Sequence, residues 1–150
     1  MTIHEPFITR CYELAEQAVA AGNHPFAALI VVDGKVMSEA LNTVVTEADV
    51  TCHAELNLIR SAFQQLSPEV LKTATLYSST EPCPMCAGAI YWSGISRLVF
   101  GVSVADLGEI AGEAFVWSSA EILERGNRRI EVIGPIAAGT GRKLHQSFWI

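Results

Sequence analysis

The chain has 150 residues, of which 50% are hydrophobic and 17% are charged, and its ten basic and sixteen acidic residues give a net charge of −6. This composition excludes a disordered chain, and the length predicts one domain over residues 1–150 with a buried core. The acidic balance argues against a partner held mainly through its phosphates, because such binding needs clustered lysine and arginine.

The sequence also predicts the compartment. It contains no apolar run of the roughly 20 residues that cross a bilayer. The start, Met1 to Pro6, lacks the basic and apolar pattern of a signal peptide. We therefore expect a cytoplasmic protein without membrane contact. In that compartment its four cysteines are expected to be metal ligands or buried thiols rather than disulfides.

The first part of the chain predicts a helix followed by two strands. Residues 7–21 carry an apolar stripe at helical spacing and are followed by a glycine, which is typical of an amphipathic helix and its end. Residues 26–32 form a continuous apolar run, as in a central strand covered on both faces. Asp33 and Gly34 predict a hairpin turn that returns the chain as a second strand through Leu41.

The rest of the chain alternates between helical and strand patterns. The expected elements are a helix from about residue 52, a strand around Leu76, a helix from Pro84 to about Ser93, a strand over 98–102, a helix from Ser118 to Gly126, a strand over 130–133 and a helix over 142–150. Residues 103–117 show no clear pattern. Strands that alternate with helices predict an α/β fold whose mixed sheet is covered on both sides.

Two short fragments carry the chemistry, His53-Ala54-Glu55 and the run from Pro82 that holds Cys83 and Cys86. Each lies near the expected start of a helix, whose positive end favours thiolate over thiol. The two cysteines are three residues apart, so they share one helix face. Two thiols and one imidazole suit a catalytic zinc ion that keeps an open coordination position.

Glu55 supplies the acid–base group that such a zinc site needs. Two thiolates and one neutral imidazole give zinc a first shell without net charge, which makes the ion a weaker acid toward water. We infer that Glu55 takes a proton from water activated at the zinc. In the hydrolysis of an amino-substituted heterocycle, Glu55 would pass this proton to a nitrogen of the substrate ring and help ammonia leave. A structural zinc with Cys52 as fourth ligand is the alternative, but adjacent residues such as Cys52 and His53 rarely reach one metal.

The combination of H-x-E and P-C-x-x-C resembles the cytidine-deaminase-like superfamily, and within it the branch of bacterial guanine deaminases and tRNA adenosine deaminases. The resemblance runs from about residue 7 to residue 101. It implies a three-layer α/β/α sandwich with a mixed central sheet, and usually a homodimer. It also implies that His53, Cys83 and Cys86 bind zinc and that Glu55 moves protons.

The same resemblance implies substrate contacts at five positions: Phe26, Asn42, Ala54, Trp92 and Glu113. Asn42 matches an asparagine that contacts the substrate base, and Trp92 matches an aromatic residue that covers the substrate in guanine deaminases. Phe26 either stacks on a purine ring or fills the core. The acidic C-terminal motif of guanine deaminases is not visible, and Glu109 and Glu113 are the nearest candidates.

The expected function is zinc-dependent deamination of a small heterocyclic amine, a free base or nucleoside, with a guanine-like purine or a triazine favoured. The main alternative is a tRNA-specific adenosine deaminase. Those enzymes usually end in a basic helix, whereas residues 142–150 hold only Arg142 and Lys143 as cations, so nucleic acid is the weaker choice. A zinc-stabilised binding module without catalysis is a third alternative, which Glu55 argues against.

Overall fold

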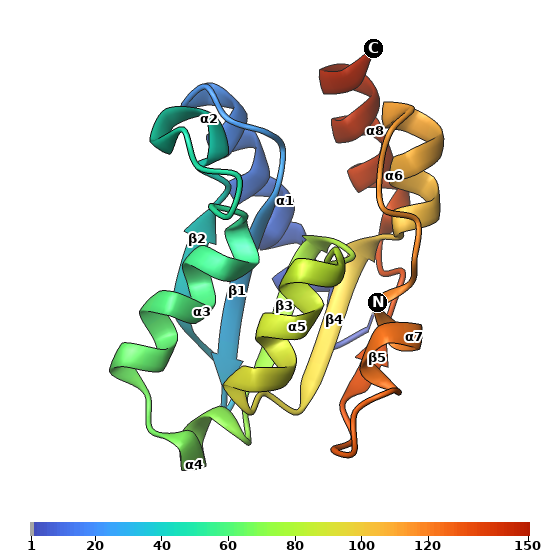
Figure 1. The fold of residues 1–150 in the computed structure, drawn as a ribbon. Coiled ribbons are helices and arrows are strands. Elements are labelled where there is room, and N and C mark those ends of the chain that lie inside the picture. The colour runs from blue at the N-terminus through green and yellow to red at the C-terminus, as the bar shows by residue number, and fades with distance from the viewer. Residues whose placement is uncertain (1) are drawn as a thin grey trace.

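The computed structural model describes residues 2–150 and contains a five-stranded sheet with helices on both faces (Figure 1). The strands are Ala27–Val32 (β1), Lys35–Leu41 (β2), Thr75–Thr80 (β3), Arg97–Val102 (β4) and Glu131–Ile133 (β5). The helices are Glu5–Ala20 (α1), Val44–Glu47 (α2), Ala54–Gln65 (α3), Pro68–Leu71 (α4), Pro84–Ser93 (α5), Val104–Ala111 (α6), Ser119–Leu123 (α7) and Ala138–Trp149 (α8). None of the helices between residues 2 and 150 is both long and apolar enough to span a membrane.

The strand order is β2-β1-β3-β4-β5. β1 runs antiparallel to both β2 and β3, whereas β3, β4 and β5 are parallel to one another. The expected mixed sheet is therefore confirmed. Because parallel strands end at the same edge of a sheet, the last residue of β3, Thr80, pairs with the last residue of β4, Val102.

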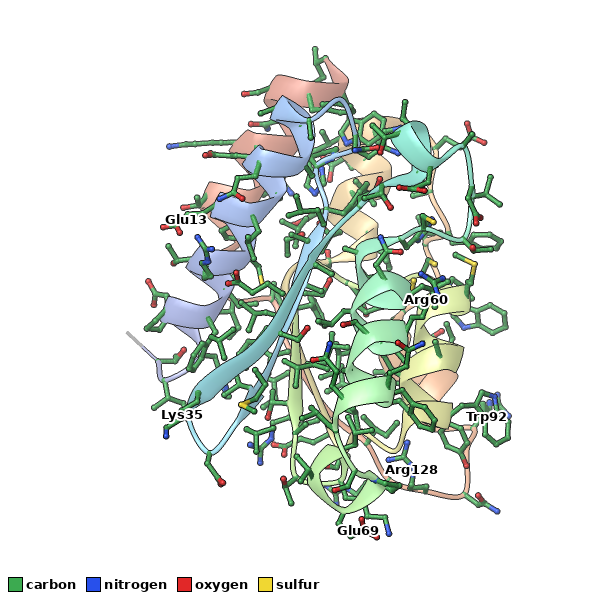
Figure 2. The ribbon with its side chains drawn as sticks, turned by 90° about the vertical axis from the view of Figure 1, so that its left-hand side faces the viewer. Glu13, Lys35, Arg60, Glu69, Trp92 and Arg128 are labelled. Atoms are coloured by element: carbon green, nitrogen blue, oxygen red, sulfur yellow. The ribbon has the colours of Figure 1, made fainter. Side chains whose placement is uncertain are left out.

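The two faces of the sheet are covered by different helices, as the edge-on view in Figure 2 shows. Side chains alternate between the faces along each strand. Leu76 and Leu98 pack into the core formed with α3 and α5. Their neighbours Tyr77 and Val99 pack into the core formed with α1. The α/β/α sandwich predicted from the sequence is thus the observed architecture.

The segment without a clear sequence pattern contains a helix. α6 is preceded by Ser103, whose side-chain oxygen accepts a hydrogen bond from the Asp106 amide at 3.1 Å, and it is followed by Gly112, where φ is +81°. The helix expected from Ser118 is also present, and the Ser118 hydroxyl accepts from the Glu121 amide. It ends at Leu123, short of the expected Gly126.

The last helix begins earlier than its sequence predicts. α8 starts at Ala138 rather than at 142. The two glycines of its first turn, Gly139 and Gly141, disfavour a helix by local propensity. Gly141 is nevertheless required there, because a Cβ at this position would clash with Tyr12 and Val102. Close packing of α8 on the sheet therefore overrides the local preference.

Candidate active site

The functional side chains come from the N-termini of two helices on the same side of the sheet. His53 is the residue before α3, and Glu55 lies in the first turn of that helix. Cys83 is the residue before α5, and Cys86 lies in its first turn. Pro84 opens α5, since its fixed φ suits the first helical position and its missing N–H is not needed there.

His53, Cys83 and Cys86 are positioned to bind a metal ion. Their ligand atoms all lie within 4.8 Å of one another. The Nδ1 atom of His53 lies 3.7 Å from the sulfur of Cys83 and 3.5 Å from that of Cys86. A tetrahedral zinc ion with ordinary bond lengths separates a sulfur ligand from a nitrogen ligand by roughly 3.6 Å. The three residues therefore fit zinc, as the sequence predicts.

One of the two thiols, Cys83, already favours its negatively charged form at this point. A hydrogen bond from Cys86, supported by the adjacent His53, lowers the pKa of Cys83 to about 4. The same hydrogen bond, together with burial, raises the pKa of Cys86. The pair by itself thus holds one negative charge at neutral pH, and a bound cation favours the second thiolate.

Glu55 lies beside this cluster and is only 5% exposed. Burial, followed by the negative charge of Cys83, raises the pKa of its carboxyl group. The Ser78 hydroxyl lies 3.4 Å from its Oε1 atom and donates to the Thr80 carbonyl at 2.7 Å. A carboxyl group with a raised pKa is suited to accept and return a proton near neutral pH.

A cavity of about 450 Å³ opens beside the cluster and is lined in part by His53, Glu55 and Cys83. Its other walls are mainly apolar and include Phe26 and Trp149. No lysine or arginine occurs among the described residues that line it. The lining thus combines apolar walls with a few polar side chains, as is usual in binding sites for small molecules.

Glu81 also lines the cavity, but its carboxylate oxygens already accept hydrogen bonds from other parts of the protein. It accepts hydrogen bonds from the Val104 amide at 3.0 Å, the Ser119 amide at 2.8 Å and the Ser119 hydroxyl at 2.6 Å. Glu81 therefore connects the segment after β3 to the starts of α6 and α7. Sequence reasoning missed this role, because the partners lie more than 20 residues away along the chain.

The structure brings some of the expected substrate contacts to the cavity and not others. Phe26 and Glu113 line it together with the metal cluster. Ala54 is fully buried at the start of α3. Asn42 is buried outside the cavity lining, and its side-chain oxygen accepts a hydrogen bond from the backbone of α2. Trp92 is 82% exposed and lies at the outer surface (Figure 2). All five contacts stay predictions.

Three residues near the cavity were not found from the sequence. His145 in α8 is buried, and its Nε2 atom lies 2.7 Å from the Thr80 hydroxyl oxygen. The indole N–H of Trp149 donates to Nδ1 of His145 at 3.1 Å. Thr80 and Trp149 line the cavity. The four-residue spacing of His145 and Trp149 is the one local signal that indicates a shared helix face.

Comparison with known proteins relates the chain to zinc-dependent deaminases. The family profile described as "Cytidine and deoxycytidylate deaminase zinc-binding region" matches residues 1–102. A Schizosaccharomyces pombe protein named "Probable cytosine deaminase" is 34% identical over 148 residues, covering 95% of this chain and 90% of that protein. A Bacillus subtilis guanine deaminase is 39% identical over 120 residues, covering 79% and 77%. A Haemophilus influenzae tRNA-specific adenosine deaminase is 34% identical over 146 residues, covering 96% and 82%.

Solved structures show the same relationship. A structure from a study of A-to-I editing by tRNA:A34 deaminases has a TM-score of 0.77 at 29% identity, covering 92% of this chain and 97% of that one. A variant protein in complex with 8-azaguanine has a TM-score of 0.84 at 26% identity, covering 95% and 83%.

Proposed function

Because the chain belongs to the family of the cytidine and deoxycytidylate deaminase zinc-binding region, we propose that it removes the amino group of a small heterocyclic base by zinc-dependent hydrolysis. A guanine-like purine or a triazine is the favoured substrate, as a free base or nucleoside. The observation that carries this proposal is a largely apolar cavity that joins Glu55 to the metal cluster and has no lysine or arginine among its lining residues.

The proposed reaction exchanges an amino group for an oxygen. His53, Cys83 and Cys86 would hold the zinc ion, which would supply the positive charge that lowers the pKa of water. Glu55 accepts a proton from the attacking water and delivers it to a ring nitrogen of the substrate. The oxygen forms a bond to the amino-bearing carbon, Glu55 carries the second proton to the amino group, and ammonia leaves as the carbon–nitrogen bond breaks. The product carries a carbonyl oxygen in place of the amino group.

The cavity supports substrate contacts of two kinds. Phe26 offers an aromatic ring against which a flat base can stack, and Glu113 offers a carboxylate that can accept hydrogen bonds from ring N–H or amino groups. A guanine-like edge carries such donors. We also propose Asn42, Ala54 and Trp92 as substrate contacts, because they correspond to such contacts in the guanine deaminases that the chain resembles.

A tRNA-specific adenosine deaminase is the second candidate, favoured by the 34% identity with the H. influenzae protein. The small number of free cations in α8 argues against this second candidate. Arg142 and Lys143 are the cations of α8, and Arg142 is paired with Asp106 of α6 at 2.7 Å. RNA binding needs several free cations for the phosphates.

The test is a substrate panel with zinc-loaded protein. Ammonia release is measured from guanine, ammeline, adenine, cytosine, isocytosine and their nucleosides, with tRNA as comparator. We expect release from a purine or triazine base. Activity on tRNA alone would overturn the proposed substrate class, and release from no compound would overturn the proposed deamination.

We also infer a homodimer. Several large apolar side chains are exposed, among them Trp92 at 82% and Ile150 at 90%. Burial of such residues on a second copy removes apolar surface from water. Light scattering at micromolar protein concentration should give twice the chain mass, and a strict monomer would contradict the inference.

A further inference from the structure

A chain of hydrogen bonds runs from α8 to the cavity wall, and no step of the proposed reaction uses it. Trp149 donates through its indole nitrogen to Nδ1 of His145 at 3.1 Å. Nε2 of His145 lies 2.7 Å from the hydroxyl oxygen of Thr80, the last residue of β3. Both ends of this chain, Trp149 and Thr80, line the cavity, whereas His145 is 1% exposed.

The direction of these hydrogen bonds follows from the chemistry of their groups. An indole N–H can only donate, so Nδ1 of His145 accepts and carries no proton. Burial lowers the pKa of His145 to about 4, so the imidazole is neutral at pH 7. Its hydrogen-bond partners Thr80 and Trp149 and the ring of Phe26, whose centroid is 5.4 Å away, are uncharged, and burial is the one cause of the lowered pKa. The imidazole proton therefore lies on Nε2 and is donated to Thr80.

The Thr80 hydroxyl must then direct its own proton elsewhere. Its oxygen accepts from His145, and a hydroxyl can donate one hydrogen bond in addition to those it accepts. Among residues 2–150, the structure gives this hydroxyl no other hydrogen-bond partner than His145. Thr80 lines the cavity and is 3% exposed, so a molecule bound there can accept this remaining hydrogen bond.

We propose that the Thr80 hydroxyl donates a hydrogen bond to an acceptor atom of the bound heterocycle, a ring nitrogen or a carbonyl oxygen. His145 and Trp149 are positioning residues that fix the direction of this donor. The proposal rests on the proposed function for the identity of the ligand. The Thr80 hydroxyl, as a donor, complements the carboxylates of Glu55 and Glu113, which accept hydrogen bonds. This donor would favour bases that present an acceptor atom near the end of β3.

Substitution of Thr80 tests the contact. Thr80→Val keeps the volume and removes the hydroxyl. It should raise KM for the best substrate of the panel about tenfold, the equivalent of a buried hydrogen bond worth about 1.4 kcal/mol, and leave kcat within about twofold. Thr80→Ser should restore KM. The matched control Thr75→Val makes the same change at the other end of β3, where Thr75 is also buried. An unchanged KM in an active Thr80→Val enzyme would overturn the proposed contact.

Substitution of Trp149 tests the positioning. Trp149→Phe keeps an aromatic wall but removes the indole donor, so His145 can move its proton to Nδ1 and accept from Thr80. KM should rise in this variant because the Thr80 hydroxyl no longer points to the ligand. In a protein that already carries Thr80→Val there is no hydroxyl to position, so the same Trp149→Phe change should raise KM less. Equal effects of Trp149→Phe in both backgrounds would overturn the positioning role.

The tautomer of His145 can be measured without any substrate. ¹⁵N NMR of the zinc-loaded protein at pH 7 should show a neutral imidazole with its proton on Nε2, and a mixture of tautomers in Trp149→Phe. A proton on Nδ1, or a charged ring, in the unmodified protein would overturn the proposal whatever the activity. If the unmodified enzyme deaminates nothing in the panel, the proposed function and the substrate contact fail together. A wrong tautomer in an active enzyme overturns only the inference on Thr80.

Discussion

His145 should make the stability of the protein depend on pH in a defined direction. Burial lowers its pKa in the folded protein to about 4, against 6.5 as the ordinary value. The unfolded chain therefore binds more protons between these two values, and folding stability rises with pH across this range. The stability that the neutral, buried His145 contributes is fully present above about pH 6.5 and is lost as the pH falls toward 4.

The size of the effect follows from the two pKa values. Each unit of difference corresponds to about 1.36 kcal/mol, so the full contribution is about 3 kcal/mol, and about 2 kcal/mol of it is lost between pH 7 and pH 5. The perturbation is His145→Gln, which cannot titrate. The free energy of unfolding of both proteins is measured by urea denaturation at pH 7, 6 and 5, with zinc present throughout.

The comparison between the two proteins isolates His145, because the other titrating groups are common to both. The variant should be less stable at pH 7, since the hydrogen bonds to Thr80 and Trp149 are altered, but it should lose about 2 kcal/mol less than the unmodified protein on acidification to pH 5. Equal losses in the two proteins would refute the assignment of a buried, neutral His145.

Three further predictions concern the metal, the proposed base and the packing of α8. Purified protein should hold about one zinc ion per chain by elemental analysis, and a zinc-free preparation that folds and is active would contradict the site. Glu55→Ala should retain zinc but lower turnover at least about a hundredfold in an ammonia-release assay, whereas near-normal activity would remove Glu55 from the mechanism. Gly141→Ala should lower the free energy of unfolding by about 1–3 kcal/mol, because the new methyl group meets Tyr12 and Val102. Gly139→Ala, with no atom within 4 Å of its new methyl group, is the matched control and should not destabilise the protein.

The metal cluster could be predicted from the sequence because its determinants are local. Cys83 and Cys86 lie one helical turn apart, a proline marks the start of their helix, and His53 and Glu55 share another helix start. Such short-range patterns are read directly from the residue order. The first two strands were predictable for the same reason, since the apolar run over residues 26–32 marks β1 and the turn at Asp33 and Gly34 returns the chain as β2.

The rest of the site depends on contacts between distant residues. Glu81 binds the backbone at Val104 and Ser119, and His145 binds Thr80 across 65 positions of the sequence. Neither contact has a local pattern. α6 was missed because its eight residues follow a strand directly, without a linker rich in turn residues. The early start of α8 was missed because Gly141 is chosen by packing rather than by helix propensity.

The family profile ends at residue 102, where β4 ends. The metal cluster and Glu55 lie before that point, whereas Leu107, Glu113 and Trp149, which line the cavity, come after it. The relatives named for cytosine and tRNA adenosine deamination nevertheless align over 95% and 96% of this chain, beyond the end of the profile. The cavity is thus built from both parts of the chain, since Phe26 and Thr80 lie within the profile and face a lining completed by residues after it.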